Sequence, residues 1–442
     1  MSDDMMKALS EKLDTTAPTL TALDSYWQGT QPAAFLSTDA REALGDKFRM
    51  LAVNFPRLAV EALSERLRVT GFRLDGPDGD PDEGLWKVWR RNRMEDAAAQ
   101  AHTDALVYGR SFVIVWAGAN GQPLVTVESP RQVAVLRDPA TREVTAAVKR
   151  WHADGYGHAV LYGPDRIVRY KSRARVTDGG SFPTTGWEVV SEIPNPLGVV
   201  PVVPIVNRGR LLDVDGVSEM ADVLDLADAL NKLVLDMMVT SEHYARPRRW
   251  ATGLEIMEDD EGNPVKPFSV ALDDVWQAED PATKFGQFDA TGLGGYTDAV
   301  ALLTQQIGAL TGLPPHYLGL NGDQPPSADA IRSAEASLVS RAYALHRSLG
   351  QAWADVARLI VAVRDGSDPV ALDVETVWAN PETRTTGQSA DAAAKLVGVG
   401  VPLPVVLADQ MGYTPAQVQR VREAIRTQAL DSAGVDLTEL VA

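Results

Sequence analysis

The pattern of apolar and polar positions predicts helices first, then a sheet, then helices again. Residues 1–35 indicate short helices broken at Pro18, Gly29 and Pro32, and residues 38–67 and 84–109 have a helical period. Between 111 and 210, short apolar runs separated by turn residues predict a meandering antiparallel sheet. The expected strands are 111–116, 124–127, 133–136, 144–151, 159–162, 167–170 and 187–190.

Two long helices with an acidic block between them follow the sheet. The first, 216–244, spans ~42 Å at 1.5 Å per residue. One arc of it is apolar and includes Val217, Met220, Leu224, Ala227, Leu230 and Val234. A different arc carries Asp215, Glu219, Asp222, Asp225 and Asp236. Residues 251–292 hold ten acids and two Lys, and 296–311 return as a helix. Neither helix has a sequence-adjacent partner long enough to cover its apolar stripe, so we expect the same pair in neighbouring subunits to cover it, within a closed ring.

The C-terminal part is mostly helical. Ser327 predicts the cap of a helix that reaches ~55 Å and is long enough to need a kink. A strand is expected over 370–377. Short helices are expected at 390–397, 404–411 and 415–430.

Composition narrows the function only by exclusion. The chain has 442 residues, no Cys and a formal net charge of −18. The lack of Cys excludes disulfides, thiolate metal sites and a Cys nucleophile. No apolar run approaches the ~18 residues of a membrane span, and we expect no signal peptide. The acidity is explained either by solubility or by a surface that DNA must pass without being held, because holding phosphates requires clustered Lys and Arg.

Residues that could carry catalysis or bind a metal are scattered. Six His occur, and none lies four residues from another, so no helical metal pair is predicted. Glu258, Asp259, Asp260 and Glu261 stand together, but they lack the spacing of an EF-hand and favour a solvated turn.

Three cations stand out in the predicted sheet. Lys171, Arg173 and Arg175 form a small basic patch at a strand end. A solvated loop is favoured for this patch over a nucleic-acid site, because three charges alone are a weak signal.

Short fragments spread over most of the chain resemble one protein family. They are YWQG at 26–29, VNFPR at 53–57, VTGFR at 69–73, NPLGVVPVVP at 195–204, NR at 207–208, GLPPHYLG at 312–319, SADAI at 327–331 and GYTP at 412–415. In this order and at these separations, they resemble the portal proteins of long-tailed, siphovirus-type double-stranded DNA phages, especially those that infect actinobacteria.

The resemblance implies an α+β portal fold, with an antiparallel-sheet and helix wing, long stem helices, a loop-rich clip and a helical crown. The segments carried over are 1–212 and 327–383 for the wing, 213–250 and 293–312 for the stem, 251–292 for the clip, 313–326 for a tunnel loop and 384–442 for the crown.

The same resemblance implies a portal subunit rather than an enzyme, with no cofactor and no metal. Twelve copies are expected to form a ring at one capsid vertex, through which double-stranded DNA is packaged and ejected without sequence recognition. The expected partners are terminase, a head–tail adaptor, and the major capsid and scaffold proteins. The expected location is the virion, assembled in the host cytoplasm without a membrane.

The expected site residues lie in these segments. Asn321, Gly322, Asp323 and Gln324 of the tunnel loop are expected nearest the channel axis. Glu258, Asp259, Asp260 and Glu261 of the clip are expected to face adaptor and terminase. The expected stem acidic face is Asp215, Glu219, Asp222 and Asp236, and the expected subunit interface is Val217, Met220, Leu224, Leu230 and Val234.

Two other classes stay open from the residues alone. One is a metal-dependent DNA-processing enzyme that uses the acid clusters, which metal-dependent cleavage by the purified protein would reveal. The other is a different structural head protein, such as a minor capsid or adaptor protein. A ring with a central channel, seen by negative-stain microscopy, separates the portal from both.

Overall fold

The computed structural model describes residues 2–32, 34–35, 52–76, 81–177, 179–183, 185–207, 210–245, 249–253, 281–287, 293–320, 327–382, 386–413 and 415–432. The chain divides into two units. The first contains residues 1–31, 54–224 and 310–442, and the second contains residues 32–53 and 225–309.

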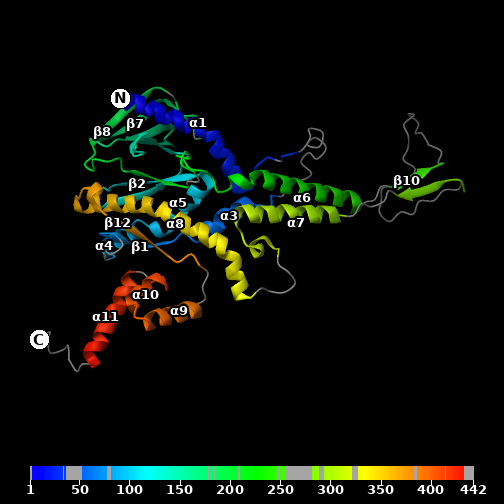
Figure 1. Cartoon of the computed structure of the whole chain (residues 1–442). Coiled ribbons are helices and arrows are strands. Elements are labelled where there is room, and N and C mark those ends of the chain that lie inside the picture. The colour runs from blue at the N-terminus through cyan, green and yellow to red at the C-terminus, as the bar shows by residue number, and fades with distance from the viewer. Residues whose placement is uncertain are drawn as a thin grey trace. The chain divides into compact units, whose positions relative to one another are not determined.

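Two antiparallel sheets lie at the centre of the first unit (Figure 1). In the three-stranded sheet, β2 (Arg110–Ala117) lies between β3 (Pro123–Glu128) and β9 (Val202–Val206). The five-stranded sheet follows chain order: β4 (Val133–Arg137), β5 (Val144–Ala153), β6 (Tyr156–Tyr162), β7 (Arg166–Arg175) and β8 (Trp187–Pro194). All seven predicted strands are present, but the prediction of one meandering sheet is wrong.

The division into two sheets follows from β2, which is apolar on both faces. Phe112 and Ile114 pack with residues of β4 and β5, whereas Val113 and Val115 belong to the main core with the helices. A strand buried on both sides needs cover on both sides, so the second sheet packs against one face of the first. The additional strand β9, which pairs with β2, was not predicted.

The first helix, α1 (Ser2–Gln28), continues through Pro18, so the predicted break there is wrong. Proline removes one backbone donor and strains the preceding turn. Contacts on both sides of it offset this cost. Leu9 and Leu13 pack with the five-stranded sheet, and Leu20 belongs to the main core.

Three helices precede β2: α3 (Phe55–Ser64), α4 (Glu83–Arg91) and α5 (Met94–Tyr108). The helical period predicted for 38–67 is interrupted, because residues 52–54 are not helical and Asn54 caps α3 by accepting from Arg57 N at 3.1 Å. The part of that prediction at 38–51 lies outside the described residues. Arg93, in the left-handed region at φ 55°, separates α4 from α5.

The longest helix, α8 (Ala328–Asp365), begins as predicted, with the Ser327 hydroxyl accepting from Ala330 N at 3.2 Å. Figure 1 shows it changing direction along its length. The short helix η3 (Pro315–Leu318) precedes it. After it, η4 (Pro369–Ala371) occupies the start of the strand predicted at 370–377. The strand itself is β12 (Val374–Trp378), which pairs with β1 (Val69–Leu74) from the other end of the chain.

The predicted C-terminal helices are present as α9 (Thr386–Gly398), α10 (Leu403–Asp409) and α11 (Pro415–Ser432).

The second unit contains most of two long helices that lie side by side (Figure 1). These are α6 (Leu224–Ala245) and α7 (Gly294–Thr311). The Thr240 hydroxyl lies 3.3 Å from the Tyr296 hydroxyl across them. Beyond them, β10 (Arg249–Thr252) pairs with β11 (Lys284–Gln287).

The helix predicted from residue 216 begins later, with η2 (Ala221–Val223) leading into α6. The backbone before it makes tertiary hydrogen bonds instead of helical ones: Val217 N donates to Asn207 O at 2.9 Å and Glu219 N to Leu106 O at 2.8 Å. Gly216 has φ +80°, and a Cβ on it would overlap Gly109 O. This close backbone approach requires glycine and excludes helix at that point.

Candidate functional site

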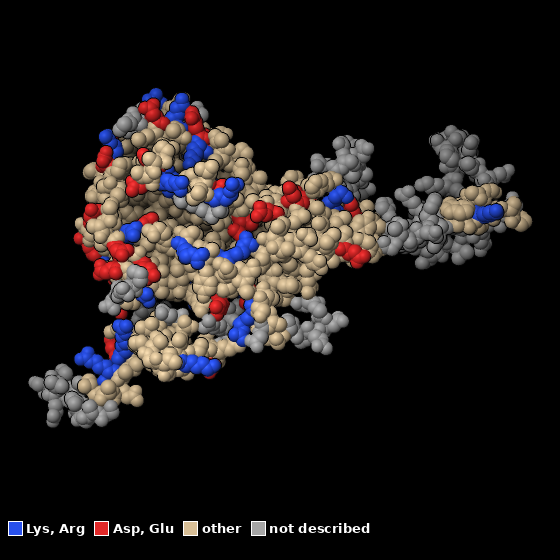
Figure 2. Space-filling model, in the orientation of Figure 1, with Lys and Arg blue, Asp and Glu red and all other residues tan. Residues whose placement is uncertain are grey.

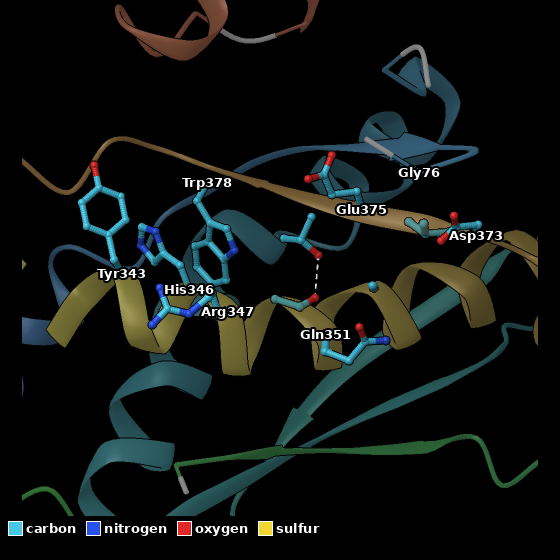
Figure 3. Close-up of a pocket in the computed structure, with 12 residues that line it drawn as sticks. Gly76, Tyr343, His346, Arg347, Gln351, Asp373, Glu375 and Trp378 are labelled. Atoms are coloured by element: carbon cyan, nitrogen blue, oxygen red, sulfur yellow. Dashed lines mark hydrogen bonds between the residues drawn. The ribbon is translucent and has the colours of Figure 1, made fainter. Parts of the chain in front are cut away.

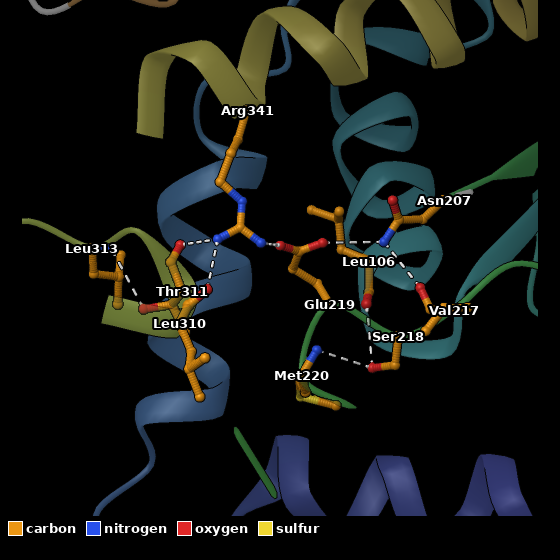
Figure 4. Close-up of polar contacts among 10 residues, drawn as sticks. All are labelled: Leu106, Asn207, Val217, Ser218, Glu219, Met220, Leu310, Thr311, Leu313 and Arg341. Atoms are coloured by element: carbon orange, nitrogen blue, oxygen red, sulfur yellow. Dashed lines mark hydrogen bonds and ion pairs between the residues drawn. The ribbon is translucent and has the colours of Figure 1, made fainter. Parts of the chain in front are cut away.

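One arginine of the predicted wing connects to both segments of the predicted stem (Figure 4). Arg341 of α8 donates to Leu310 O at 3.1 Å and to Thr311 O, the last carbonyls of α7. The same guanidinium pairs with the Glu219 carboxylate at 2.5 Å. Its charge complements the negative end of α7 and satisfies carbonyls that lack helical partners.

Glu219 is held from its other side as well. Its Oε2 accepts from Asn207 Nδ2 at 3.3 Å, and the same amide donates to Val217 O at 3.0 Å. We call Arg341, Glu219, Asn207, Leu310 and Thr311 the helix-end network. It fixes the chain just before α6 and the end of α7 against α8, and therefore sets where α6 begins and where α7 ends.

The sequence analysis did not identify Arg341, because its partners lie 30 or more positions away along the chain. A signal did exist for Asn207, which belongs to one of the family-like fragments. Its side chain and backbone both bind the segment that precedes α6.

Three of the four residues predicted as an acidic face have their negative charge paired with a cation. Asp215 pairs with Lys12 at 2.8 Å, Glu219 with Arg341, and Asp236 with Lys232 one turn away. Asp222 is exposed. Each ion pair reduces the local negative potential, so the field of this surface is weaker than four carboxylates imply.

The stripe predicted as a subunit interface is largely covered within one chain. Met220 is fully buried, Leu230 is 1% exposed and Val234 is 8% exposed. Val217 is 39% exposed, and Leu224 is half-buried. The expectation that only neighbouring subunits cover this stripe is therefore wrong for Met220, Leu230 and Val234, which are buried within one chain, Met220 as part of the main core.

The predicted tunnel-loop residues Asn321, Gly322, Asp323 and Gln324 lie outside the described residues. So do the clip residues Glu258, Asp259, Asp260 and Glu261. The structure describes the start of the tunnel-loop segment, where η3 begins after Pro314.

This start is bound to α8 through buried charge. The Glu335 side chain is 5% exposed and pairs with Arg66 at 3.3 Å. The Tyr317 hydroxyl accepts from Arg66 at 3.2 Å and donates to Glu335 at 3.5 Å. A buried ion pair requires good geometry to balance the desolvation of both ions, so this contact fixes η3 in one position.

A groove of about 410 Å³ lies between α8 and β12 (Figure 3). His346 of α8 stacks on Trp378 of β12, with ring centroids 4.5 Å apart and planes 6° apart. Its Nε2 donates to Arg66 O at 3.0 Å, and burial lowers the pKa of His346. Since this nitrogen is engaged in a hydrogen bond to the backbone, it is not free to act as a general base in the groove.

A second histidine, His102, is fully buried in the main core. Its Nε2 accepts from Trp353 Nε1 at 2.7 Å. Burial lowers the pKa of His102 to about 3, so the ring is neutral at physiological pH. Both histidines therefore serve packing.

Within the described ranges, His, Asp and Glu side chains do not gather in groups of three that could hold a metal ion. None of the described helices is long and apolar enough to cross a membrane.

Comparisons with solved structures find distant likenesses. A chain from the neck of the native gene transfer agent particle, computed with C12 symmetry, is 13% identical, with 79% of this chain and 84% of that chain covered and a TM-score of 0.45. One from the neck of the empty particle, computed with C6 symmetry, is also 13% identical, with coverages of 83% and 90% and a TM-score of 0.47.

Sequence comparisons are much closer. The portal protein of Mycobacterium phage L5 is 34% identical over 407 residues, which cover 87% of this chain and 80% of that protein. The portal protein of Mycobacterium phage D29 is 34% identical over 406 residues, with the same coverage. The family model described as phage portal protein, SPP1 Gp6-like, matches residues 7–408. The chain therefore belongs to the phage portal protein family.

Proposed function

We propose that this chain is the subunit of a ring of twelve at one capsid vertex, through which double-stranded DNA is packaged and ejected. The observation that carries the proposal is the 34% identity to phage portal proteins over 87% of the chain. The long helix pair α6–α7, joined through the β10–β11 hairpin, supports it as the proposed stem and part of the clip.

The proposed ring needs a surface that neighbouring copies cover. Of the predicted stripe, Val217 and Leu224 stay accessible, while Met220, Leu230 and Val234 support the surface from within the chain. Three further apolar side chains on the helix pair are exposed: Met238 at 40%, Leu302 at 56% and Leu310 at 49%. Contact between neighbouring copies removes such side chains from water, which favours a repeated head-to-tail interface.

The proposed channel has two contributors. The tunnel-loop residues Asn321, Gly322, Asp323 and Gln324 are proposed for its narrowest part, and the exposed Asp222 for the stem acidic face. None of these side chains is cationic, so contact with phosphates is weak and independent of base sequence.

The proposed partners follow the segments. Terminase before packaging, and a head–tail adaptor afterwards, are proposed to bind the clip at Glu258, Asp259, Asp260 and Glu261. Major capsid and scaffold proteins are proposed around the wing. The chain is proposed to act in the virion as a structural protein rather than an enzyme, after assembly in the host cytoplasm.

Negative-stain microscopy of the purified chain tests the proposal. We expect rings with a central channel, and image classes that count twelve subunits. Particles without a channel, or monomers at every concentration, contradict it. Cleavage of DNA that depends on a divalent metal would contradict the structural role.

A pair of matched variants tests the interface. Leu302→Asp, on α7, should weaken the ring by light scattering, because a carboxylate in an interface costs several kcal/mol if unpaired. Leu124→Asp is the control, since Leu124 is similarly exposed at 49% but lies on β3. Equal effects of the two variants would exclude the helix pair as the interface.

A further inference from the structure

Strand β7 carries five cations, and they divide into two groups. Arg166 pairs with Glu192 at 2.8 Å and Arg173 with Glu188 at 2.9 Å, both across to β8. The other three are Arg169, Lys171 and Arg175, and within the part of the chain that the structure describes they have no carboxylate partner. The second group makes no ion pair among the described residues, and Glu188, which lies opposite Lys171 in the β7–β8 register, is bound by Arg173.

These three cations are accessible from one region of the sheet. Val168 and Tyr170 pack in the core with α1, so Arg169 and Lys171, which alternate with them, lie on the opposite face. In register, Lys171 is opposite His158 and Arg175 is opposite Tyr156 on β6. Figure 2 shows Lys and Arg side chains among acidic ones over the part that Figure 1 labels β7 and β8.

One aromatic ring, that of Tyr156, contacts two of the three cations. Lys171 Nζ lies 3.9 Å from the centroid of the Tyr156 ring, and the Arg175 guanidinium carbon lies 5.8 Å from it. Cation–π contact favours these positions without neutralising the charge. Long side chains that are already ordered lose less entropy when they bind a ligand.

We propose that Arg169, Lys171 and Arg175 form a DNA-contacting surface on the wing sheet, which binds the phosphate backbone of duplex DNA without reading its sequence. Residues 169–175 of β7 lie opposite only residues 160–156 of β6, because the register shifts between Lys171 and Arg175, so the three cations span ~13 Å at 3.3 Å per residue. Each strand of duplex DNA carries one phosphate per ~3.4 Å along the axis, so a line of cations of this length meets several phosphates. This site is independent of the channel proposed above.

The rings themselves favour a duplex over single-stranded DNA. Single strands are held by bases stacked on open aromatic faces. Here the Tyr156 ring is covered by Lys171, and Trp151 stacks on His158 with centroids 5.6 Å apart. With these faces occupied, the surface offers charge to phosphates rather than a platform for bases. An acidic segment of another protein is the competing ligand.

Fluorescence anisotropy with a labelled duplex of about 30 base pairs tests the proposal. Binding at low salt is expected, and the logarithm of the association constant should fall with the logarithm of salt concentration with a slope of about −2.7 for three phosphate contacts. Changing all three cations to Gln should lower the affinity about tenfold or more and bring the slope close to zero. Absence of duplex binding by the unaltered chain would overturn the proposal.

The matched control removes the same charge elsewhere. Arg420, Arg422 and Arg426 are exposed on α11, and changing these to Gln should leave affinity within about threefold. An equal loss in both triple variants would mean that only net charge matters, which overturns the site. Competition by polyglutamate is a second measurement. If polyglutamate displaces the labelled duplex as well as unlabelled duplex DNA does at equal charge, the proposal is overturned, because the ligand is then an acidic protein segment. Arg169→Lys with Arg175→Lys should keep most binding, which separates lost charge from a folding defect.

Discussion

The two halves of α8 are held in the molecule by different kinds of contact. In the C-terminal half, Leu349, Trp353, Val356 and Ile360 are fully buried in the main core. The N-terminal half, 328–344, is mostly exposed, with Leu338 and Ala342 as its buried apolar residues, and it also forms ion pairs with other segments. Its Glu335 pairs with Arg66 beside η3, and its Arg341 pairs with Glu219 before α6.

The difference separates stability from positioning within one helix. Apolar burial contributes about 1.5–3 kcal/mol for each large side chain, without fixing direction. Ion pairs with hydrogen bonds contribute less net free energy but accept one geometry. We therefore expect the C-terminal half to hold the first unit together. The N-terminal half should position residues 313–318, the segment before α6 and the end of α7.

The largest effect is expected in the C-terminal half. Trp353→Ala should lower the free energy of unfolding by about 3–5 kcal/mol, because it leaves a cavity and removes the hydrogen-bond donor to His102. Urea denaturation measures it. Tyr343→Ala is the control in the N-terminal half. Because Tyr343 is 40% exposed, this change should lower the free energy of unfolding by less than about 1 kcal/mol. Equal costs would remove the distinction between the halves.

Glu335→Gln should have the next largest effect. It should lower the free energy of unfolding by about 3 kcal/mol, because it leaves Arg66 buried without its carboxylate partner. Glu375→Gln is a suitable control, since Glu375 is 41% exposed and pairs with Arg73, so the expected cost is below about 1 kcal/mol. Both are measured by denaturation.

A double variant then distinguishes position from stability. Replacing both Glu335 and Arg66 by Met should recover much of the loss, because a buried ion pair is often replaceable by apolar groups. Failure to recover would mean that this pair itself stabilises the fold, contrary to the positioning role.

Low pH should lower the free energy of unfolding through His102, which contacts the C-terminal half of α8 at Trp353. Its pKa is about 3 in the folded chain, from burial, against an ordinary value of 6.5. In the unfolded chain His102 therefore binds a proton below about pH 6.5, whereas in the folded chain it binds one only below about pH 3. Stability is fully present above pH 6.5 and falls as pH is lowered, by about 2 kcal/mol at pH 5.

His346 acts in the same direction, because burial lowers its pKa too. Unfolding free energies measured between pH 7 and pH 5 test this, with His102→Gln expected to reduce the slope. An unchanged slope in that variant would contradict the assignment to His102.

The elements of the fold were predictable where their cause is local. Alternating apolar runs located all seven expected strands, and the Ser327 hydroxyl caps α8 as its position indicated. The family could be identified from short sequence fragments that occur in the same order as in phage portal proteins. The sites proposed at the clip and the tunnel loop stay predictions.

Features with distant causes were missed. The pairing of β2 with β9 joins strands more than 80 residues apart, so one sheet was expected where two exist. The late start of α6 depends on contact between Gly109 and Gly216, which neither local sequence reveals. In the sequence, Arg341 looks like any exposed helical arginine, because its partners Leu310 and Thr311 come from a distant segment.

The smallest effect on stability is expected at Arg341, and it decides whether this half of α8 positions the long helices. Its side chain is 36% exposed, so Arg341→Ala should cost only about 1 kcal/mol. The change should instead be local, because Leu310 and Thr311 lose their donor and Glu219 loses its cation. Hydrogen exchange should therefore accelerate over 217–224 and 310–313 and stay constant over 349–362. Arg341→Lys keeps the charge but not the fork that reaches both partners, so it should show most of the same acceleration. A destabilisation as large as that of Trp353→Ala, or unchanged exchange at both helix ends, would show that the two halves of α8 do the same work.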